Sequence, residues 1–131
     1  MRNIMKKILQ SLLFVGLFCT AYLSHAVQDQ RVSHVVVIWL KEPGNAQMRE
    51  KFINIRRSLK TLPGVLSRHV SAVISSDKPN VNDTFDIAVT VTFKNVQALK
   101  KYMQSQQHKD MLHKRLKPLV NRVEVYNFGN I

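Results

Sequence analysis

Hydrophobic and polar positions follow patterns along the chain that predict four β-strands. Residues 32–40 (VSHVVVIWL) are an almost unbroken apolar run rich in β-branched side chains, which is typical of a strand buried on both faces. Residues 85–93 (FDIAVTVTF) and 120–128 (VNRVEVYNF) alternate instead, which predicts strands with one buried face. In the first of these, the alternation places Asp86 on the polar face. Residues 65–74 predict the remaining strand.

Helical periodicity occupies two stretches between the predicted strands. Asn45 is a predicted N-cap, and the helix after it is expected to end at LPGV, residues 62–65. Its apolar stripe consists of Met48, Phe52, Ile55 and Leu59. Residues 75–84 are polar and rich in turn formers, so they predict a loop. Asn95 is expected to cap a second helix, which breaks at residues 105–107 and resumes as a third.

The predicted order β-α-β-β-α-α-β indicates an α+β fold in one domain, a ferredoxin-like split βαβ sandwich with its helices on one face of the sheet. The first strand is apolar on both sides, so the second face of the sheet also needs a cover. A second copy of the same sheet is the simplest cover, which predicts a homodimer and a dimeric α+β barrel. Trp39, whose strand parity is opposite to that of His34, is expected in this interface.

The N-terminus has the pattern of a signal peptide. A basic start (MRNIMKK) precedes an apolar run and the small residues of SHA, which predicts a cleaved signal peptide at residues 1–26 and a mature domain at 27–131. Export to the periplasm or secretion follows, and no stable membrane span is expected after cleavage. An uncleaved anchor, or a lipoprotein with Cys19 at its start, is the less favoured alternative. Cys19 is the only cysteine, so no thiol chemistry is expected in the mature chain.

The chain carries a strong positive charge, which does not by itself identify a specific partner. The formal net charge is +12, and it stays strongly positive when the three basic residues of the predicted signal peptide are removed. A solubilising surface explains this charge most simply, and attraction to anionic lipids or polymers is the alternative. The basic residues are scattered and lack interleaved aromatic residues, so no specific nucleic acid partner is predicted.

Five segments resemble those of a known family in their order and spacing. They are HVVVIWLK at 34–41, LPGV at 62–65, DIAVTVTF at 86–93, YMQSQQH at 102–108 and KPLVNRVEVYNF at 117–128. In these segments the chain resembles the stress-responsive A/B barrel (Dabb) proteins, and the resemblance covers essentially all of the chain after residue 26. It implies a dimeric α+β barrel of ferredoxin-like fold.

The resemblance also implies candidate site residues. Some members, notably a plant polyketide cyclase, catalyse cofactor-free aldol cyclisation with a tyrosine and a histidine, which fall here on Tyr102 and His108. The histidine that starts the family's first strand falls on His34. Other members are known only as stress-induced proteins or have no known role. The chain departs from the family where SQQH replaces the frequent HPxH, and where Asn127 replaces an acidic residue.

Tyr102 and His108 are the candidate catalytic pair. On one unbroken helix they point in different directions, but a break at residues 105–107 allows both to face the space between helices and sheet. A neutral imidazole can accept a proton there, while a phenol can donate to an oxygen that gains charge. The alternative is a histidine satisfied by a backbone carbonyl and a tyrosine at a pocket rim.

A ligand pocket is expected around His34. The residues predicted to line it are His34, Val36, Ile38, Phe52, Ile55, Met111 and Asn127. The alternative places His34 at a strand end near solvent. His69 has no evident partner and is interpreted as non-functional, and His113 is assigned to a solvated basic face.

No metal or cofactor site is predicted. His108 and His113 are five positions apart and do not share a helical face, and the chain has no HExxH motif, Cys/His cluster or Gly-rich phosphate loop. Two main hypotheses remain. One is an exported homodimer that binds a small apolar or aromatic ligand, with no proven catalysis. The other is a cofactor-free, polyketide-cyclase-like enzyme that uses Tyr102 and His108. A weaker third is an envelope protein that uses its basic surface.

Overall fold

The computed structural model describes residues 29–129. The predicted signal peptide and Cys19 lie outside these residues, so cleavage and export stay predictions. The elements are β1 (Val32–Leu40), α2 (Ala46–Arg57), β2 (Val65–Ala72), β3 (Ile87–Phe93), α3 (Val96–Gln104), α4 (Gln106–Asp110), the π-helical segment η1 (Met111–Leu116) and β4 (Val120–Gly129). The predicted order and the predicted helix break are both confirmed.

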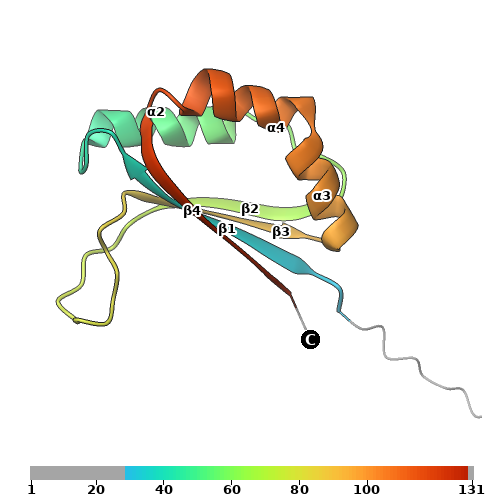
Figure 1. Ribbon diagram of the computed structural model, residues 1–131, viewed down its shortest axis with the longest axis horizontal. Helices are drawn as coiled ribbons and strands as arrows, with labels where there is room; N and C mark the ends of the chain where they lie inside the picture. The colour runs from blue at the N-terminus through green and yellow to red at the C-terminus, as the bar shows by residue number, and fades with distance from the viewer. Residues whose placement is uncertain (1–28, 130–131) are drawn as a thin grey trace, which may run out of the picture.

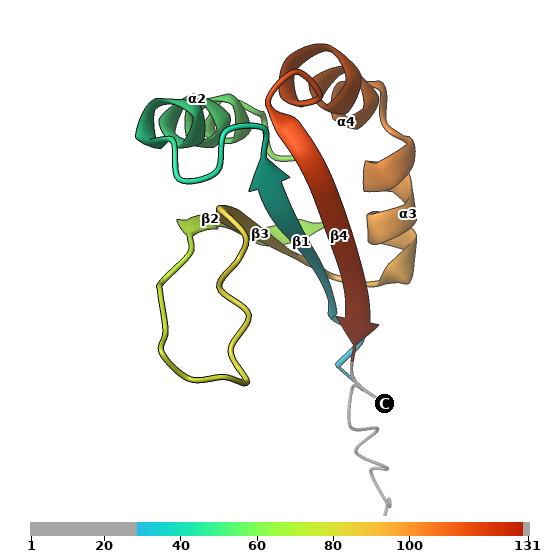
Figure 2. The same cartoon turned by 60° about the vertical axis from the view of Figure 1, so that its left-hand side comes forward.

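The strands form one sheet in the order β2-β3-β1-β4, and every neighbouring pair is antiparallel. The helices lie together on one face of this sheet, and the opposite face is uncovered (Figures 1 and 2). This arrangement is the predicted ferredoxin-like α+β fold. Within the described residues, no helix has both the length and the apolar character needed to cross a membrane.

The register of β1 decides which side chains reach the helices. His34 lies opposite Val91 of β3 and Asn127 of β4, and Val36 lies opposite Val89 of β3. Because side chains alternate along a strand, these positions share the face that the helices cover. The core there includes the fully buried Phe52, Phe93, Ile38, Leu40, Ile87, Met111, Val89 and Val91.

The predicted helix caps are present. The Asn45 side chain accepts a hydrogen bond from the Met48 amide at 2.9 Å, and the Asn95 side chain accepts one from the Ala98 amide at 2.9 Å. Each cap satisfies an amide that has no partner within its helix. Gly64 lies before β2 with φ +87°, and a Cβ built on it is 2.6 Å from the Cβ of Ala98. Only glycine therefore fits this close approach of the chain to α3.

The alternation predicted for residues 85–93 is wrong at its start. The strand begins at Ile87, and Asp86 is buried instead of lying on a polar face. Its carboxylate accepts hydrogen bonds from the backbone amides of Leu40 at 2.8 Å and Gly44 at 2.7 Å. A buried carboxylate needs such donors, so Asp86 holds the turn after β1 and has a structural role.

The uncovered face of the sheet is partly apolar. Tyr126 and Phe128 are 51% and 58% exposed there, beside the partly exposed Val35 and Val37. Trp39 behaves differently from the expectation, because its own chain already buries it. The Arg122 guanidinium lies 3.7 Å from the centroid of the Trp39 ring, and Phe85 packs edge-on against it. Trp39 therefore needs no partner for its burial.

Candidate functional site

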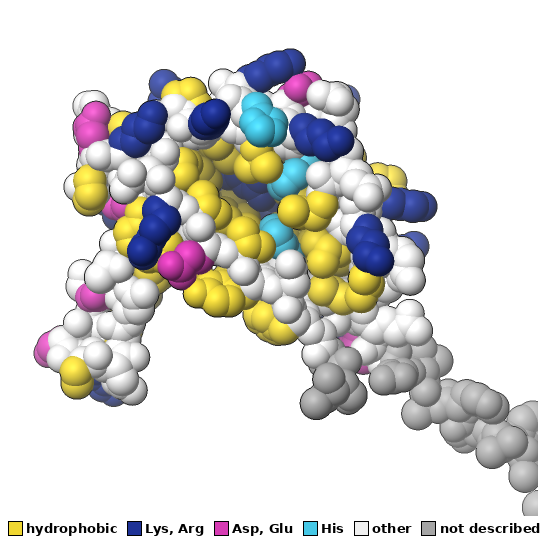
Figure 3. All heavy atoms as spheres, in the orientation of Figure 1, with side chains coloured by type: hydrophobic (Ala, Val, Ile, Leu, Met, Phe, Trp, Pro, Cys, Tyr) yellow, Lys and Arg dark blue, Asp and Glu magenta, His cyan; other side chains and the backbone are white. Residues whose placement is uncertain are grey.

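A cavity of about 270 Å³ opens between the sheet and the helices. Figure 3 shows it as a hollow bordered by hydrophobic side chains, with histidines on its wall. The apolar walls consist of Val36, Ile38, Phe52, Val89, Leu112, Leu116, Val120 and Val123. The polar lining consists of His34, Arg56, His108, His113 and Lys117. Polar side chains in an apolar concave site are the usual composition of a ligand pocket.

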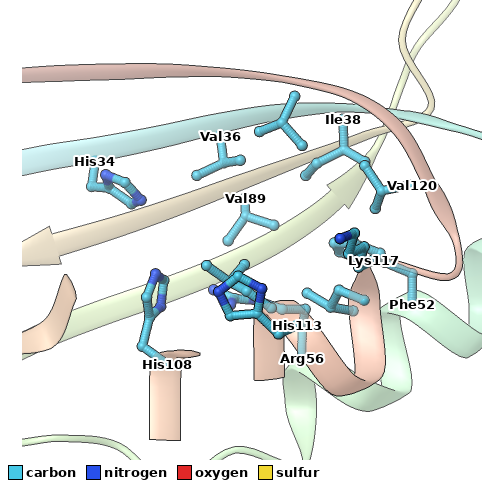
Figure 4. Close-up of a pocket in the computed structure, with 13 residues that line it drawn as sticks. His34, Val36, Ile38, Phe52, Arg56, Val89, His108, His113, Lys117 and Val120 are labelled. Carbon is cyan, nitrogen blue, oxygen red and sulfur yellow. The ribbon is translucent and has the colours of Figure 1, made fainter. Parts of the chain in front are cut away.

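The polar side chains reach the cavity from several elements. His34 comes from β1, Arg56 from the last turn of α2 and His108 from α4, and His34 and His108 point toward each other (Figure 4). Arg56 follows Phe52 by four residues, so the two lie on the same face of α2. The π-helical segment η1 supplies Leu112 and His113. Segments far apart in the chain thus build one site.

Tyr102 and His108 are brought together, as the predicted helix break requires. Their ring centroids lie 4.6 Å apart, and each residue is buried. Ser105 has extended backbone between α3 and α4, and its hydroxyl donates to the Tyr102 carbonyl at 2.8 Å. Only His108 of this pair lines the cavity, while Tyr102 packs behind it against Phe93, at 5.1 Å between ring centroids.

Arg56 is the main site residue that sequence reasoning missed. Its side chain is 4% exposed, with Nη1 2.7 Å from Met111 Sδ and Nη2 donating to the Tyr102 hydroxyl at 3.2 Å. Its Nε has no hydrogen-bond partner. The spacing from Phe52 is the signal that identifies it, because a charged residue on an apolar stripe is exceptional. Burying an arginine without an anion costs several kcal/mol.

No acidic side chain neutralises Arg56. All eight Asp and Glu residues of the chain fall within residues 29–129, and none lines the cavity. The ion pairs that the described part contains join Arg31 with Asp29, Lys114 with Asp110, and Arg122 with Glu124. The cavity therefore contains a buried positive charge whose hydrogen-bond acceptors are a thioether and a phenol.

His34 is hydrogen-bonded and buried. Its Nδ1 lies 2.7 Å from Asn127 Oδ1, so Nδ1 carries the proton when the Asn127 carbonyl oxygen accepts this bond. Burial lowers the pKa of His34; the bond to Asn127 opposes this shift, and the charge of Arg56 adds to it. The ring consequently favours the neutral form, with Nε2 as its acceptor.

His108 is also held neutral. Its pKa is lowered to about 4, chiefly by burial and to a smaller extent by the charges of Arg56 and His34. Its Nδ1 is buried without a hydrogen-bond partner in the described structure. A neutral imidazole at the cavity wall can accept a proton or a hydrogen bond. With so low a pKa it is a weak base until an anion approaches.

Only some of the residues predicted to line the pocket do so in the structure. His34, Val36, Ile38 and Phe52 line the cavity. Ile55 instead packs against the core, Met111 is buried behind Arg56, and Asn127 contacts His34 from β4. His113 is exposed as predicted, but it borders the cavity together with Lys117 instead of belonging only to a basic surface. No cluster of three or more metal-binding side chains occurs among residues 29–129.

Comparison with known sequences identifies one family. The sequence profile of the family described as Stress responsive A/B Barrel Domain matches residues 32–130. No protein of curated function matches the chain.

Solved structures show the same fold at low sequence identity. A Dabb family protein with a ferredoxin-like fold from Mesorhizobium loti is 17% identical, with a TM-score of 0.63 over 77% of this chain and 97% of that one. A hydroxynitrile lyase from Passiflora edulis is 18% identical, with a TM-score of 0.64 over 76% and 93%. A dimeric ferredoxin-like protein of unknown function from Thermobifida fusca is 15% identical, with a TM-score of 0.62 over 79% and 93%.

Proposed function

Because the chain belongs to the stress-responsive A/B barrel domain family, we propose that it is an exported homodimer that binds a small apolar or aromatic ligand in the cavity between sheet and helices. The observation that carries this proposal is the cavity itself. Its volume of about 270 Å³ is close to the lower end of the usual range for ligand pockets, roughly 300–1,000 Å³. The ligand is therefore small.

The polar atoms of the cavity support a ligand-binding role. Arg56 Nε and His108 Nδ1 are buried without hydrogen-bond partners. A buried polar atom left in this state costs about 1–3 kcal/mol, so a well-packed structural core has little use for such groups. A bound molecule that lies against Arg56 and fills the apolar walls offsets part of the cost of burying this charge.

Dimerisation and export rest on other observations. Some solved structures of this fold are described as dimeric, and the sheet face opposite the helices has apolar side chains available to a second copy. Pairing two such faces removes Tyr126, Phe128, Val35 and Val37 from water. Export rests on the N-terminal sequence pattern alone.

A second candidate function is cofactor-free proton transfer in a cyclase- or lyase-like reaction. The contact between Tyr102 and His108 favours it, and the structural similarity to a hydroxynitrile lyase is compatible with it. His108 would accept the proton, with Tyr102 donating a hydrogen bond. Two features argue against strong catalysis: the pKa of His108 is lowered to about 4, and Asn127 stands where a carboxylate would raise the basicity of His34.

An NMR screen tests the binding proposal. Small aromatic and acyl compounds, both charged and neutral, are titrated into the protein while the ring resonances of all histidines are followed. We expect binders to shift His34 and His108 while leaving the exposed His69 unchanged. A cavity-filling variant, Val36→Phe, is expected to weaken these binders. Equal shifts at every histidine, or no binder at all, would contradict the proposal. The compounds that bind are then assayed for turnover with wild type and His108→Ala.

A further inference from the structure

We infer that the ligand carries a carboxylate on an apolar body, and that Arg56 binds this carboxylate. The inference rests on the proposed ligand-binding function and goes beyond it by naming the chemical class of the ligand. The guanidinium of Arg56 is buried at the cavity wall without an acidic partner anywhere among residues 29–129.

The acidic residues of the chain are used elsewhere. Asp86 is the one buried carboxylate of the described residues, and the amides of Leu40 and Gly44 occupy its two oxygens. Asp110 lies close to His108 in sequence but binds Lys114 and Gln106 at the surface. No acidic side chain is therefore available to Arg56, and a bound ligand is the source of an anion that the cavity offers.

The remaining polar groups of the cavity add no negative charge. His34 and His108 favour the neutral form, and Lys117 and His113 border the opening. The field in the cavity is consequently positive, which favours anions and disfavours cations. A planar carboxylate matches the fork of a guanidinium, and the cavity has only one guanidinium. It therefore fits a carboxylate better than a phosphate dianion, which needs more donors.

The walls define the rest of the ligand. Phe52, Leu116 and Val123 belong to a lining in which most side chains are apolar. A short aryl- or alkyl-carboxylate places its charge against Arg56 and its hydrocarbon against these walls. The burial of hydrocarbon supplies affinity, and the charge supplies selectivity.

Carboxylate binding at Arg56 is also expected to change the pKa values of two histidines, which NMR can measure. The charge of Arg56 lowers the pKa values of both His108 and His34, so an anion placed against Arg56 raises them. The charged and titratable groups around Arg56 are His34 of β1, Arg68 of β2, Tyr102 of α3, His108 of α4, His113 of η1 and Lys117. None of these groups is a carboxylic acid, so the added anion meets no competing carboxylate.

The test compares two probes of nearly equal shape, 3-phenylpropanoate and 3-phenylpropanamide. Binding is measured by calorimetry at pH 7.5 to the protein expressed from its full sequence. The variants are Arg56→Gln, Arg56→Lys and the matched control Arg57→Gln, which removes an exposed charge from the same helix. We expect the wild type to bind the carboxylate at least tenfold more tightly than the amide. Arg56→Gln abolishes this preference, Arg56→Lys keeps part of it and Arg57→Gln keeps all of it.

The outcomes separate this inference from the proposed function. If both probes bind the wild type equally, or if Arg56→Gln keeps the preference, the carboxylate inference is wrong while ligand binding stands. If neither probe binds and the wider screen also finds no binder, both fail. Should Arg56→Gln not fold, NMR titration of the wild type decides: 3-phenylpropanoate must raise the pKa of His108 by at least one unit, and the amide must not. No rise overturns the inference.

Discussion

Tyr102 and His108 lie in ring contact, with centroids 4.6 Å apart, because Ser105 interrupts the helix between them. The extended backbone of Ser105 ends α3 and starts α4, so the two side chains no longer follow a single helical repeat. One polar residue thereby aligns a tyrosine and a histidine that a continuous helix would separate. The relationship is local in sequence, yet it determines the wall of the cavity.

Ser105→Ala is expected to loosen this wall. The Ser105 hydroxyl donates to the Tyr102 carbonyl, and its oxygen accepts from the His108 amide at 3.2 Å, so the variant loses an N-cap. We expect the free energy of unfolding in urea to fall by about 1 kcal/mol, with broadened His108 resonances. Ser71→Ala, at an exposed strand position, is the control and should change neither quantity. An unchanged stability for Ser105→Ala would refute the role assigned to this cap.

Stability is expected to fall in mild acid because of His108. Its pKa is lowered from 6.5 to about 4 in the folded protein, so below pH 6.5 the unfolded chain binds a proton that the folded one does not. The contribution of neutral His108 to the free energy of unfolding is complete above pH 6.5 and is lost as the pH falls to 4. We expect a loss of about 2 kcal/mol, since water at the cavity mouth screens part of the effect.

Urea unfolding at several pH values measures this loss. His108→Gln should flatten the dependence between pH 6.5 and 4, leaving the smaller contribution of His34, whose pKa is also lowered. His69→Gln, which changes an exposed histidine, should keep the wild-type dependence. Identical profiles for the two variants would mean that His108 does not titrate as described.

Asn127→Asp is expected to raise the pKa of His34. The Asn127 oxygen is 2.7 Å from His34 Nδ1, and a carboxylate there favours the protonated ring. A rise of about one unit or more, measured by NMR titration, is the expected result. Asn82→Asp, in the exposed loop, is the matched control and should leave His34 unchanged. If Asn127→Asp leaves the pKa of His34 unchanged, the side-chain hydrogen bond between His34 and Asn127 is not formed in solution.

Gly64→Ala is expected to destabilise the protein more than Gly44→Ala. Both glycines have positive φ, +87° and +73°, so both variants lose about 1 kcal/mol from backbone strain. At Gly64 the added Cβ also collides with Ala98, whereas at Gly44 nothing lies within 4 Å. Thermal unfolding should therefore show a lower Tm for Gly64→Ala than for Gly44→Ala. Equal Tm values would show that α3 moves away at little cost.

Val37→Asp is expected to shift the proposed dimer toward monomer. Val37 lies on the uncovered face of β1, where a charge must be desolvated when two sheets pack together. Sedimentation velocity should show a lower mass at micromolar concentration. Val96→Asp, an equivalent change at the exposed start of α3, should keep the wild-type mass. A wild-type protein that is already monomeric would contradict the homodimer itself.

The strands and helices were predictable because their causes are local. The apolar run of β1 and the caps at Asn45 and Asn95 each act over a few residues, and the structure confirms them. The strand predicted at residues 120–128 is also present as β4, but the buried face expected from its alternation is not, because none of its residues is buried within one copy of the chain. The prediction for the start of β3, which placed Asp86 on a polar face, was wrong for the opposite reason. Asp86 bonds to the backbone of residues more than forty positions away, which no local pattern records.

The candidate site was predictable only in part. Periodicity indicated that Phe52 faces the sheet, and strand parity placed His34 and Val36 on the same side. The pattern did not reveal that Arg56 shares that face without an acidic partner, because pairing depends on where all eight acidic residues end up.

The sequence by itself therefore determined the order of elements, the ferredoxin-like class and the family resemblance, since these follow from short-range periodicity and turn chemistry. Only the tertiary structure decided that His34 meets Asn127, that Arg122 covers Trp39 and that Arg56 is buried as an unpaired cation. These relationships depend on strand register and on packing between distant segments. Both are set by the energy of the whole assembled fold, not by any one stretch of chain.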